Sequence, residues 1–406
     1  MASKSEIILL NISGDDKLGV TATLTNILAQ SNVNILDIGQ AVIHEDLGLG
    51  ILFEVPVASE SSPILKDILF KAYELNIKVK FTPIPQERYT KWVKQQGKER
   101  YIVTLLARKL TAQHLAKVTA IIADQQLNID YISRLSGRTP LNGFNKNTRA
   151  VVEFSVRGTP VNEEKMKSAF IDTAVEIGID IAFQEDNIYR RNRRLVCFDM
   201  DSTLIQTEVI DELAFKAGVG EKVSEITEMA MRGEIDFNES FIQRVALLKG
   251  LDESVMKEIA DNLPITEGAE RLFKTLKQYG YKTAILSGGF TYFGNYLKTK
   301  LGADYVFAND LEIVNGKLTG KHKNEIVDGE KKAELLKMLA FKEDIHLEQV
   351  IAVGDGSNDL PMLKLAGLGI AFHAKPKVKE SAKHAISNIG LDALLYLLGF
   401  RDREIN

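Results

Sequence analysis

Cysteine is almost absent, since Cys197 is the only one among 406 residues. A single thiol excludes an intramolecular disulfide and argues against a thiolate metal site within one chain, so we expect a reducing compartment. No apolar run approaches the roughly 20 residues that span a bilayer, and residues 1–6 lack a basic-then-apolar signal pattern. These absences predict a cytoplasmic protein with no membrane partner.

A large excess of charge of one sign is also missing. Lys and Arg number 51 against 55 Asp and Glu, which gives a formal net charge of −4. This balance is too mild to indicate a nucleic-acid partner. The apolar fraction of 45% and the charged fraction of 26% are typical of globular proteins, and the length predicts two or three domains.

The first 185 residues contain a weak internal repeat, visible when the chain is shifted by 94 positions so that Asn34-Ile35 falls on Asn128-Ile129. Each unit predicts the order strand, helix, strand, strand, helix, strand. The proline-containing segment at 83–85 and the polar stretch after it predict a linker between the units. We therefore expect domains at residues 1–84 and 101–188, joined by a linker at 85–100.

From Leu195 onward, short apolar strands alternate with amphipathic helices, which is typical of a parallel sheet covered on both faces. We predict an α/β domain with a doubly wound parallel sheet over residues 189–406, and a helical cap over about 208–263. Asn315-Gly316 between two apolar stretches predicts a hairpin. The arginine-rich run at 189–194 is expected to be a solvated joint. Strands are expected at Leu195–Phe198, Lys282–Leu286, Gln349–Val353 and Leu368–Ala371.

Two chemical motifs directly follow predicted strands. The first places Asp199 and Asp201 at a strand end, where ligands collect in open α/β sheets. Two acids spaced by one residue can divide the work of nucleophile and proton donor. The second motif is Ser287-Gly288-Gly289, whose hydroxyl and backbone amides suit an anion.

Two further motifs lie later in the chain. Lys332, at the start of a predicted helix, can neutralise a phosphate, and the turn 354–359 carries carboxylates that suit Mg²⁺. Each of the four motifs alone also has a plain structural interpretation, as a helix cap, a tight turn, a solvated lysine or a surface turn. Their occurrence together, in order and in one domain, is far more specific.

On these residues, the chain from about Arg194 to its end resembles the haloacid dehalogenase superfamily of phosphatases, and within it the phosphoserine phosphatases. The DxDxT motif of the family is met by Asp199, Asp201 and Thr203, and its GDGxND motif by Gly354–Asp359. The resemblance implies Asp199 as nucleophile and Asp201 as general acid and then base. It also implies Mg²⁺ held by Asp199, Asp355 and the backbone carbonyl of Asp201, with Asp359 supporting the metal shell. The residues implied to hold the phosphoryl oxygens are Ser287, Gly288, Lys332 and Asn358.

The resemblance extends to the choice of substrate. Phosphoserine phosphatases pair a glutamate after the first motif with an arginine in the helical insertion, and here those positions are Glu208 and Arg244. Glu208 would meet the ammonium of O-phosphoserine and Arg244 its carboxylate. Met231 and Phe237 match apolar cap positions that shield the site. Without the resemblance, Glu208 and Arg244 are more simply interpreted as exposed helix charges.

Both N-terminal units resemble ACT domains, α+β ferredoxin-like modules that often bind amino acids. Gly14, Asp16 and Gly19 match the ligand-binding turn of that family. The aligned positions in the second unit are Arg108, Leu110 and Gln113, which depart from the pattern, so the first unit is the expected regulatory site.

The resemblance implies serine or glycine as an effector and a homodimer as the assembly. Two other hypotheses remain open at this point. One is a phosphatase or phosphotransferase for another small phosphorylated metabolite, and the other is a non-catalytic amino-acid sensor.

Overall fold

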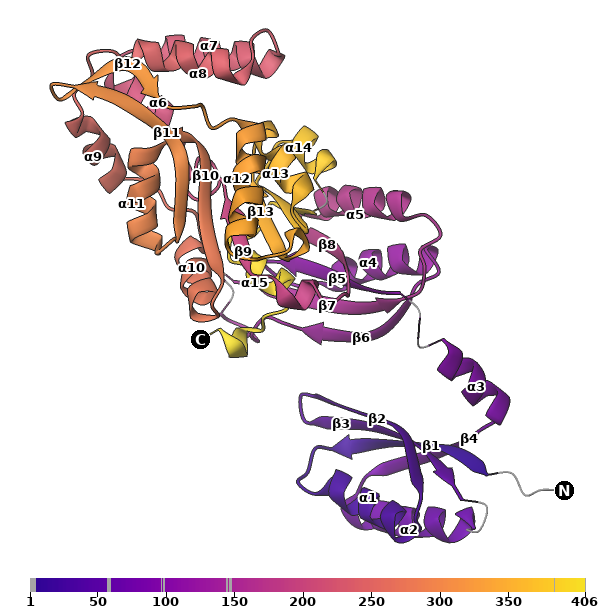
Figure 1. Cartoon of the computed structure of the whole chain (residues 1–406). Helices are drawn as coiled ribbons and strands as arrows, with labels where there is room; N and C mark the ends of the chain where they lie inside the picture. Colours follow the sequence, from indigo (N-terminus) through magenta and orange to yellow (C-terminus); the bar gives the residue numbers. More distant parts are fainter. Residues whose placement is uncertain are drawn as a thin grey trace. The chain divides into compact units, whose positions relative to one another are not determined.

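The computed structural model describes residues 5–56, 60–95, 97, 99–143, 145, 148–382 and 384–405. The chain divides into two compact units, residues 1–98 and residues 99–406 (Figure 1). Within the described part of the chain, no helix is long and apolar enough to cross a membrane.

The first unit contains a four-stranded antiparallel sheet in the order β2-β3-β1-β4, with two helices on one face (Figure 1). Its core joins Leu10 and Phe53 of the sheet to Leu24 and Ile68 of the helices. We call residues 6–84 the first module, and α3 (Gln86–Lys94) follows it in the predicted linker. The elements are β1 (Glu6–Asp15), α1 (Val20–Gln30), β2 (Asn34–Ile43), β3 (Asp46–Val55), α2 (Ser61–Leu75) and β4 (Lys78–Ile84).

The second unit begins with a copy of the same topology, residues 100–185, which we call the second module. Its sheet order, β6-β7-β5-β8, repeats that of the first module. Both copies have a register shift at the same place, between Ile35 and Asp37 in β2 and between Ile129 and Tyr131 in β6. The predicted repeat and its element order are therefore present. The elements are β5 (Arg100–Ala107), α4 (Ala112–Asp124), β6 (Asn128–Arg134), β7 (Ala150–Arg157), α5 (Glu163–Ile177) and β8 (Asp180–Glu185).

The rest of the second unit, which we call the large domain, is built on a seven-stranded sheet in the order β12-β11-β10-β9-β13-β14-β15. All neighbouring strands are parallel except β11 and β12, which form the predicted hairpin with Asn315 and Gly316 at positive φ. The four predicted strands are all present. The strands are β9 (Leu195–Phe198), β10 (Lys282–Phe290), β11 (Tyr305–Val314), β12 (Lys317–Lys323), β13 (Val350–Gly354), β14 (Leu368–Phe372) and β15 (His384–Ile386).

The central strand β9 is wholly buried because helices cover both faces of the sheet. Val196 and Phe198 point into one hydrophobic cluster, while Leu195 and Cys197 point into the other. The covering helices are α10 (Ala269–Gln278), α11 (Thr291–Leu301), α12 (Gly329–Lys342), α13 (Leu360–Leu365), α14 (Pro376–Ser381) and α15 (Ala393–Leu397), with short 3-10 helices η1 (Arg190–Asn192), η2 (Leu347–Gln349), η3 (Ser357–Asp359) and η4 (Asp402–Glu404).

The segment between β9 and α10 forms a cap of helices alone, as predicted. The cap comprises α6 (Val209–Lys216), α7 (Gly220–Arg232), α8 (Phe237–Leu247) and α9 (Ser254–Asp261). The β11–β12 hairpin is bonded to the cap, because the amides of Gly250 and Glu253 donate to the carbonyls of Leu318 and Gly316.

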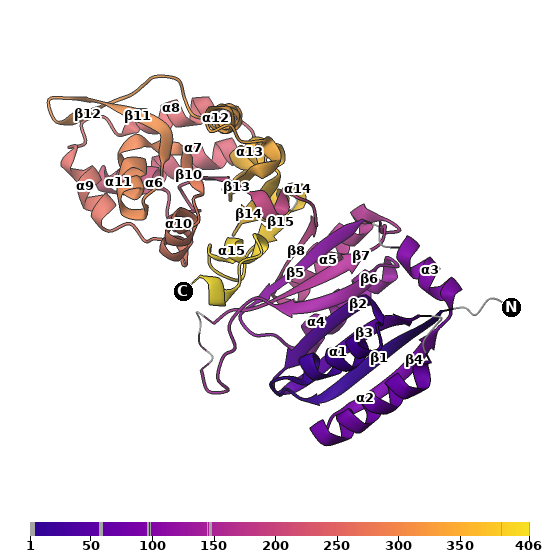
Figure 2. The same ribbon diagram turned by 60° about the horizontal axis from the view of Figure 1, so that its bottom comes forward.

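The second module packs directly on the large domain. Figure 2 shows β15 beside β8, and α15 contacts β5. The joint between them is not solvated as predicted. Arg190 and Arg193 are buried, with Arg190 paired to Glu153 and Arg193 donating to the carbonyl of Glu348. The prediction is wrong for these two side chains because the charge run lies within the contact of two packed domains rather than beside one.

Candidate active site

Asp199 lies one residue beyond the carboxyl end of β9, at the centre of the sheet. Its amide donates to the carbonyl of Val353 in β13, which fixes the chain as it leaves the strand. Its Oδ1 accepts hydrogen bonds from the amide of Met200 at 2.7 Å and from Lys332 at 2.8 Å. The chain then turns sharply, with Ser202 at φ 55°, so Asp199 and Asp201 are both buried under the cap linkers.

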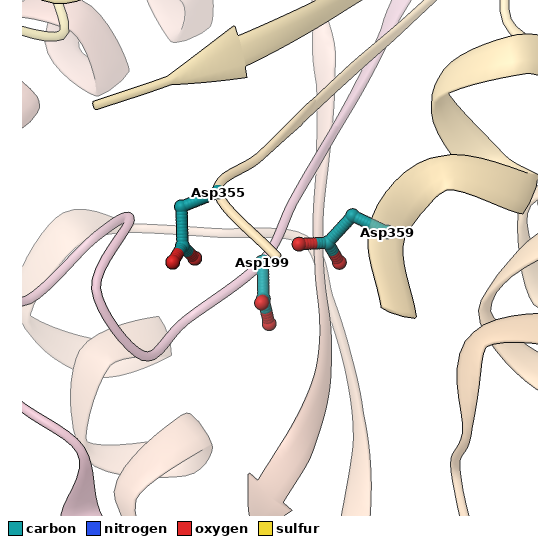
Figure 3. Close-up of side chains that lie close together, drawn as sticks. All are labelled: Asp199, Asp355 and Asp359. Carbon is teal, nitrogen blue, oxygen red and sulfur yellow. The ribbon is translucent and has the colours of Figure 1, made fainter. Parts of the chain in front are cut away.

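Three carboxylates gather at this end of the sheet. Oxygen atoms of Asp199, Asp355 and Asp359 all lie within 4.8 Å of one another, as Figure 3 shows with Asp199 between the other two. Asp355 is also bonded to the hydroxyl of Thr203 at 3.2 Å. Gly354 is required here, since a Cβ at that position would lie 2.4 Å from the Asp359 carboxylate.

Lys332 supplies the positive charge that faces this cluster. It lies in the first turn of α12, a helix capped by Asp328, which accepts from the amide of Lys331 at 2.9 Å. The ammonium is fully buried and contacts Asp199 at 2.8 Å and Asp359 at 2.7 Å. Burial lowers the pKa of Lys332, but the two carboxylates outweigh burial and raise it, so this lysine stays charged.

Three carboxyl groups of the site, those of Asp199, Asp201 and Asp355, have raised pKa values. Burial raises the pKa of Asp199 and Asp201 well above the ordinary range, assisted by the neighbouring charge of Asp359 for the former and Glu208 for the latter. Burial and the charges of Asp359 and Glu208 raise the pKa of Asp355 to about 7. One buried lysine therefore does not balance the negative charge of the cluster, and the site favours either protons or a cation.

The end of β10 completes the rim of the site. The Ser287 hydroxyl accepts from the amide of Gly289 at 2.9 Å. The backbone approaches two side chains closely, because a Cβ on Gly289 would lie 2.4 Å from Asp201 Oδ2 and one on Gly288 would lie 2.9 Å from the ring of Phe237. Glycine is needed at both positions for this contact between core and cap.

Asn309 belongs to this rim, although no sequence motif indicated it. The side chain of this buried residue donates to the Gly288 carbonyl and accepts from the amide of Val327, both at 2.8 Å. It thereby ties the glycine turn to the segment that leads into α12. The only signal in the sequence was a polar residue within β11, a strand that also carries Asp310 and Glu312.

The cap brings further charges to the site. Glu208 accepts from the hydroxyl of Ser202 at 2.8 Å. Arg244 is partly buried, and its pKa is lowered by burial while the charges of Glu208, Asp211 and Asp201 oppose that effect. Arg244 therefore faces the acidic side of the site rather than solvent.

The other predicted residues lie at different distances from the cluster. Asn358 lies in η3 and approaches the first residue of α12, because its carbonyl is 2.5 Å from where a Gly329 Cβ would be. Met231 is 65% exposed at the end of α7 and contacts the ammonium of Lys375. Gly14 is a half-buried residue near the end of β1, whereas Asp16 and Gly19 lie in the exposed turn that follows it, with Gly19 at φ 87°.

The arrangement suits transfer of a phosphoryl group. A carboxylate with one oxygen fixed and a second carboxyl group that tends to hold a proton follow the end of β9, and the buried ammonium of Lys332 in α12 contacts the first of them.

Sequence comparisons agree with the three structural parts. The sequence model of haloacid dehalogenase-like hydrolases matches residues 193–367, and two ACT domain models match residues 6–82 and 100–184. The phosphoserine phosphatase of Streptomyces coelicolor is 40% identical over 399 residues, 98% of this chain and 93% of that protein. Phosphoserine phosphatase SerB2 of Mycobacterium tuberculosis is 37% identical over 404 residues, 98% of this chain and 94% of that protein.

Solved structures give the same result. A HAD family hydrolase from Salmonella enterica serovar Typhi superposes with a TM-score of 0.63 at 30% identity, covering 73% of this chain and 98% of that one. A probable phosphoserine phosphatase from Vibrio cholerae, in its unliganded form, gives a TM-score of 0.58 at 35% identity, covering 78% and 91%. With relatives this similar along nearly its whole length, the chain belongs to the phosphoserine phosphatase family of haloacid dehalogenase-like hydrolases and is a phosphatase with two ACT domains.

Proposed function

We propose that the chain hydrolyses O-phospho-L-serine to L-serine and phosphate through a phosphorylated Asp199, the last step of serine formation. The observation that carries the proposal is the buried Lys332 between Asp199 and Asp359, which holds the nucleophile in place. The names of the full-length relatives support the choice of substrate.

Asp199 is the nucleophile because its geometry leaves one oxygen to react. Oδ1 is fixed by Lys332 and by the amide of Met200, so Oδ2 is the oxygen that attacks phosphorus. The new bond to Asp199 forms as the bond from phosphorus to the serine oxygen breaks. Lys332 stays charged throughout and stabilises the negative charge on the phosphoryl oxygens.

Asp201 moves the proton. Its raised pKa favours the protonated form, and its Oδ1 is oriented by the amide of Val209 at 3.0 Å. The protonated group donates to the departing serine oxygen, and the resulting carboxylate then takes a proton from the water that attacks phosphorus. That second displacement releases phosphate and restores Asp199 and protonated Asp201.

The phosphoryl oxygens need donors on several sides. Ser287 and the amide of Gly288 lie at the end of β10, while Lys332 and Asn358 approach from α12 and the 354–359 turn. We assign these groups to the phosphoryl oxygens because they belong to segments at the same edge of the sheet as Asp199.

The acidic cluster fits Mg²⁺. Its donors are hard carboxylate oxygens. Burial, together with neighbouring negative charge that a cation would balance, raises the pKa of Asp199 and Asp355. Asp359 is occupied by Lys332 and the amide of Gly356, so Asp199 and Asp355 with the backbone carbonyl of Asp201 are the proposed ligands and Asp359 supports them. When bound, the cation would reduce repulsion between the Asp199 carboxylate and the phosphate.

The cap selects the amino-acid part of the substrate. Arg244 would bind its carboxylate with two parallel hydrogen bonds, and Glu208 would bind its ammonium. Phe237, which lies over Gly288, and Met231 would shield the site from water.

Replacing Asp199 by Asn should abolish phosphate release from phosphoserine, by at least roughly a thousandfold in kcat, since the amide is a far weaker nucleophile. Steady-state phosphate release with Mg²⁺ measures this. The matched control is Asp344→Asn, the same chemical change at an exposed position with φ 53°, which should keep full activity. Retained hydrolysis in Asp199→Asn would rule out the proposed nucleophile.

Replacing Arg244 by Ala should raise KM for phosphoserine by roughly 10- to 100-fold, because a charged two-pronged contact is lost. Hydrolysis of a phosphate ester without an amino-acid group should change little. Arg232→Ala, which removes an exposed arginine of α7, is the control. An equal loss on both substrates would assign Arg244 to the cap structure and reopen the question of another phosphorylated metabolite.

Magnesium should stabilise the protein more at about pH 8 than at about pH 5. The pKa of Asp355 is raised from 3.8 to about 7, so the folded state binds more protons than the unfolded state between these values. The contribution of protonated Asp355 to the free energy of unfolding is fully present below the unfolded pKa. It is lost as the pH rises towards 7, where a cation can replace the proton. Thermal unfolding with Mg²⁺ and with a chelator tests this. Asp355→Asn should remove most of the difference, and an equal Mg²⁺ effect at both pH values would contradict it.

We further propose that the first module binds serine or glycine at Gly14, Asp16 and Gly19, where the end of β1 leads into an exposed turn with Gly19 at φ 87°. Calorimetric titration of the full chain with serine should show saturable heat. Asp16→Ala should weaken it, while Asp67→Ala on the exposed face of α2 should not. An absence of heat with both amino acids would leave the module a structural role.

A further inference from the structure

Two linkers join the cap to the large domain, and they lie side by side. The incoming linker is residues 204–207, before α6, and the outgoing linker is residues 263–268, after α9. The amide of Thr266 donates to the Leu204 carbonyl at 3.0 Å, and the amide of Gln206 donates to the Pro264 carbonyl at 2.9 Å. The incoming linker follows directly from the Asp199 motif. Movement of the outgoing linker therefore reaches both the cap and the nucleophile loop.

Glu267, near the end of the outgoing linker, is held by the second module. Arg108 donates to both of its carboxylate oxygens, at 2.8 and 2.7 Å, and donates from Nε to the Asn388 carbonyl at 3.0 Å. A planar, two-pronged contact of this kind fixes orientation as well as distance. The second module thus grips the large domain at the base of the cap.

A second tie reinforces the first. The backbone carbonyl of Glu267 accepts from the amide of Leu391 at 2.7 Å. The turn that contains Leu391 is itself bound to the second module, because Asp180 accepts from the amides of Ser387 and Asn388 at 2.8 and 2.9 Å. Both the side chain and the backbone of Glu267 are therefore held, one directly and one through this turn.

The backbone immediately after Glu267 is conformationally restricted. Gly268 has a φ of 82°, and a Cβ there would lie 2.2 Å from the carboxylate of Asp392. Asp392 is fully buried and accepts from Arg149 of the second module and Arg271 of α10, both at 2.8 Å. A shift of Glu267 consequently passes into the linker rather than into α10.

The repeat shows what has changed between the two modules. Arg108 follows β5 at the position that Gly14 occupies in the first module, where the proposed effector turn lies. In the second module this turn contacts protein instead. We propose that Glu267 is a positioning residue of the phosphatase, through which Arg108 of the second module holds the base of the cap and sets its closure over Asp199.

The test compares Arg108→Met and Glu267→Gln, singly and together, with Gln184→Met. The control removes a hydrogen bond of the same interface, from Gln184 to the Leu397 carbonyl at 3.2 Å, away from the cap linkers. Arg108→Lys is a milder variant that keeps the charge and loses the two-pronged contact, for use should Arg108→Met not fold. The readouts on the full chain are amide hydrogen exchange at residues 204–207 and 263–268 and the kcat and KM for phosphoserine.

Each single variant should raise exchange in both linkers and lower kcat/KM by roughly fivefold to tenfold. The double variant should be close to Arg108→Met alone, because that variant already removes the pair with Glu267 and the bond to the Asn388 carbonyl. Gln184→Met should change neither readout. Unchanged linker exchange in the Arg108 variants, or the same pattern in Gln184→Met, would overturn the proposal. The kinetic readout rests on the proposed function, but the exchange readout does not. If the wild-type protein is inactive on phosphoserine, the proposed function fails and the exchange readout still tests the role of Glu267.

Discussion

The contact between the buried ammonium of Lys332 and the carboxylates of Asp199 and Asp359 is the constraint on which the site depends. Two carboxylates this close and this deep would otherwise repel each other or take up protons, and an unpaired buried charge is costly. The charged groups lie beyond the ends of β9 and β13, between two large apolar clusters. Burial of those clusters offsets the free-energy cost of the buried charges. The same contact fixes one oxygen of Asp199, so under the proposed function the geometry that stabilises the cluster would also orient the attacking oxygen.

Most of the core of the site was predictable from the sequence, for a topological reason. In a parallel sheet, motifs that follow successive strands meet at one edge, so Asp199, Ser287 and Asp355 had to converge once their strands were assigned. Lys332 could be placed because its helix begins beside that edge. The repeat of the two N-terminal modules was likewise visible, because Asn34-Ile35 and Asn128-Ile129 fall on one another at a shift of 94 positions and the predicted element order recurs.

What the sequence did not reveal depends on contacts between distant segments. Arg108 and Glu267 are 159 positions apart, and neither belongs to a motif. Asn309 is one polar residue in a strand, and its partners are a carbonyl and an amide that leave no mark in side-chain identity. The arginine run was misinterpreted for the same reason, since burial of Arg190 and Arg193 follows from a domain contact that composition cannot show.

The backbone bonds that join the β11–β12 hairpin to the cap limit how this enzyme can admit its substrate. A lid attached at its two linkers and also to the edge of the central sheet cannot swing wide without detaching a strand. Under the proposed function, a cap restricted in this way would admit a small free ester more readily than a phosphorylated loop of a folded protein, so substrate size would be selected before charge is recognised.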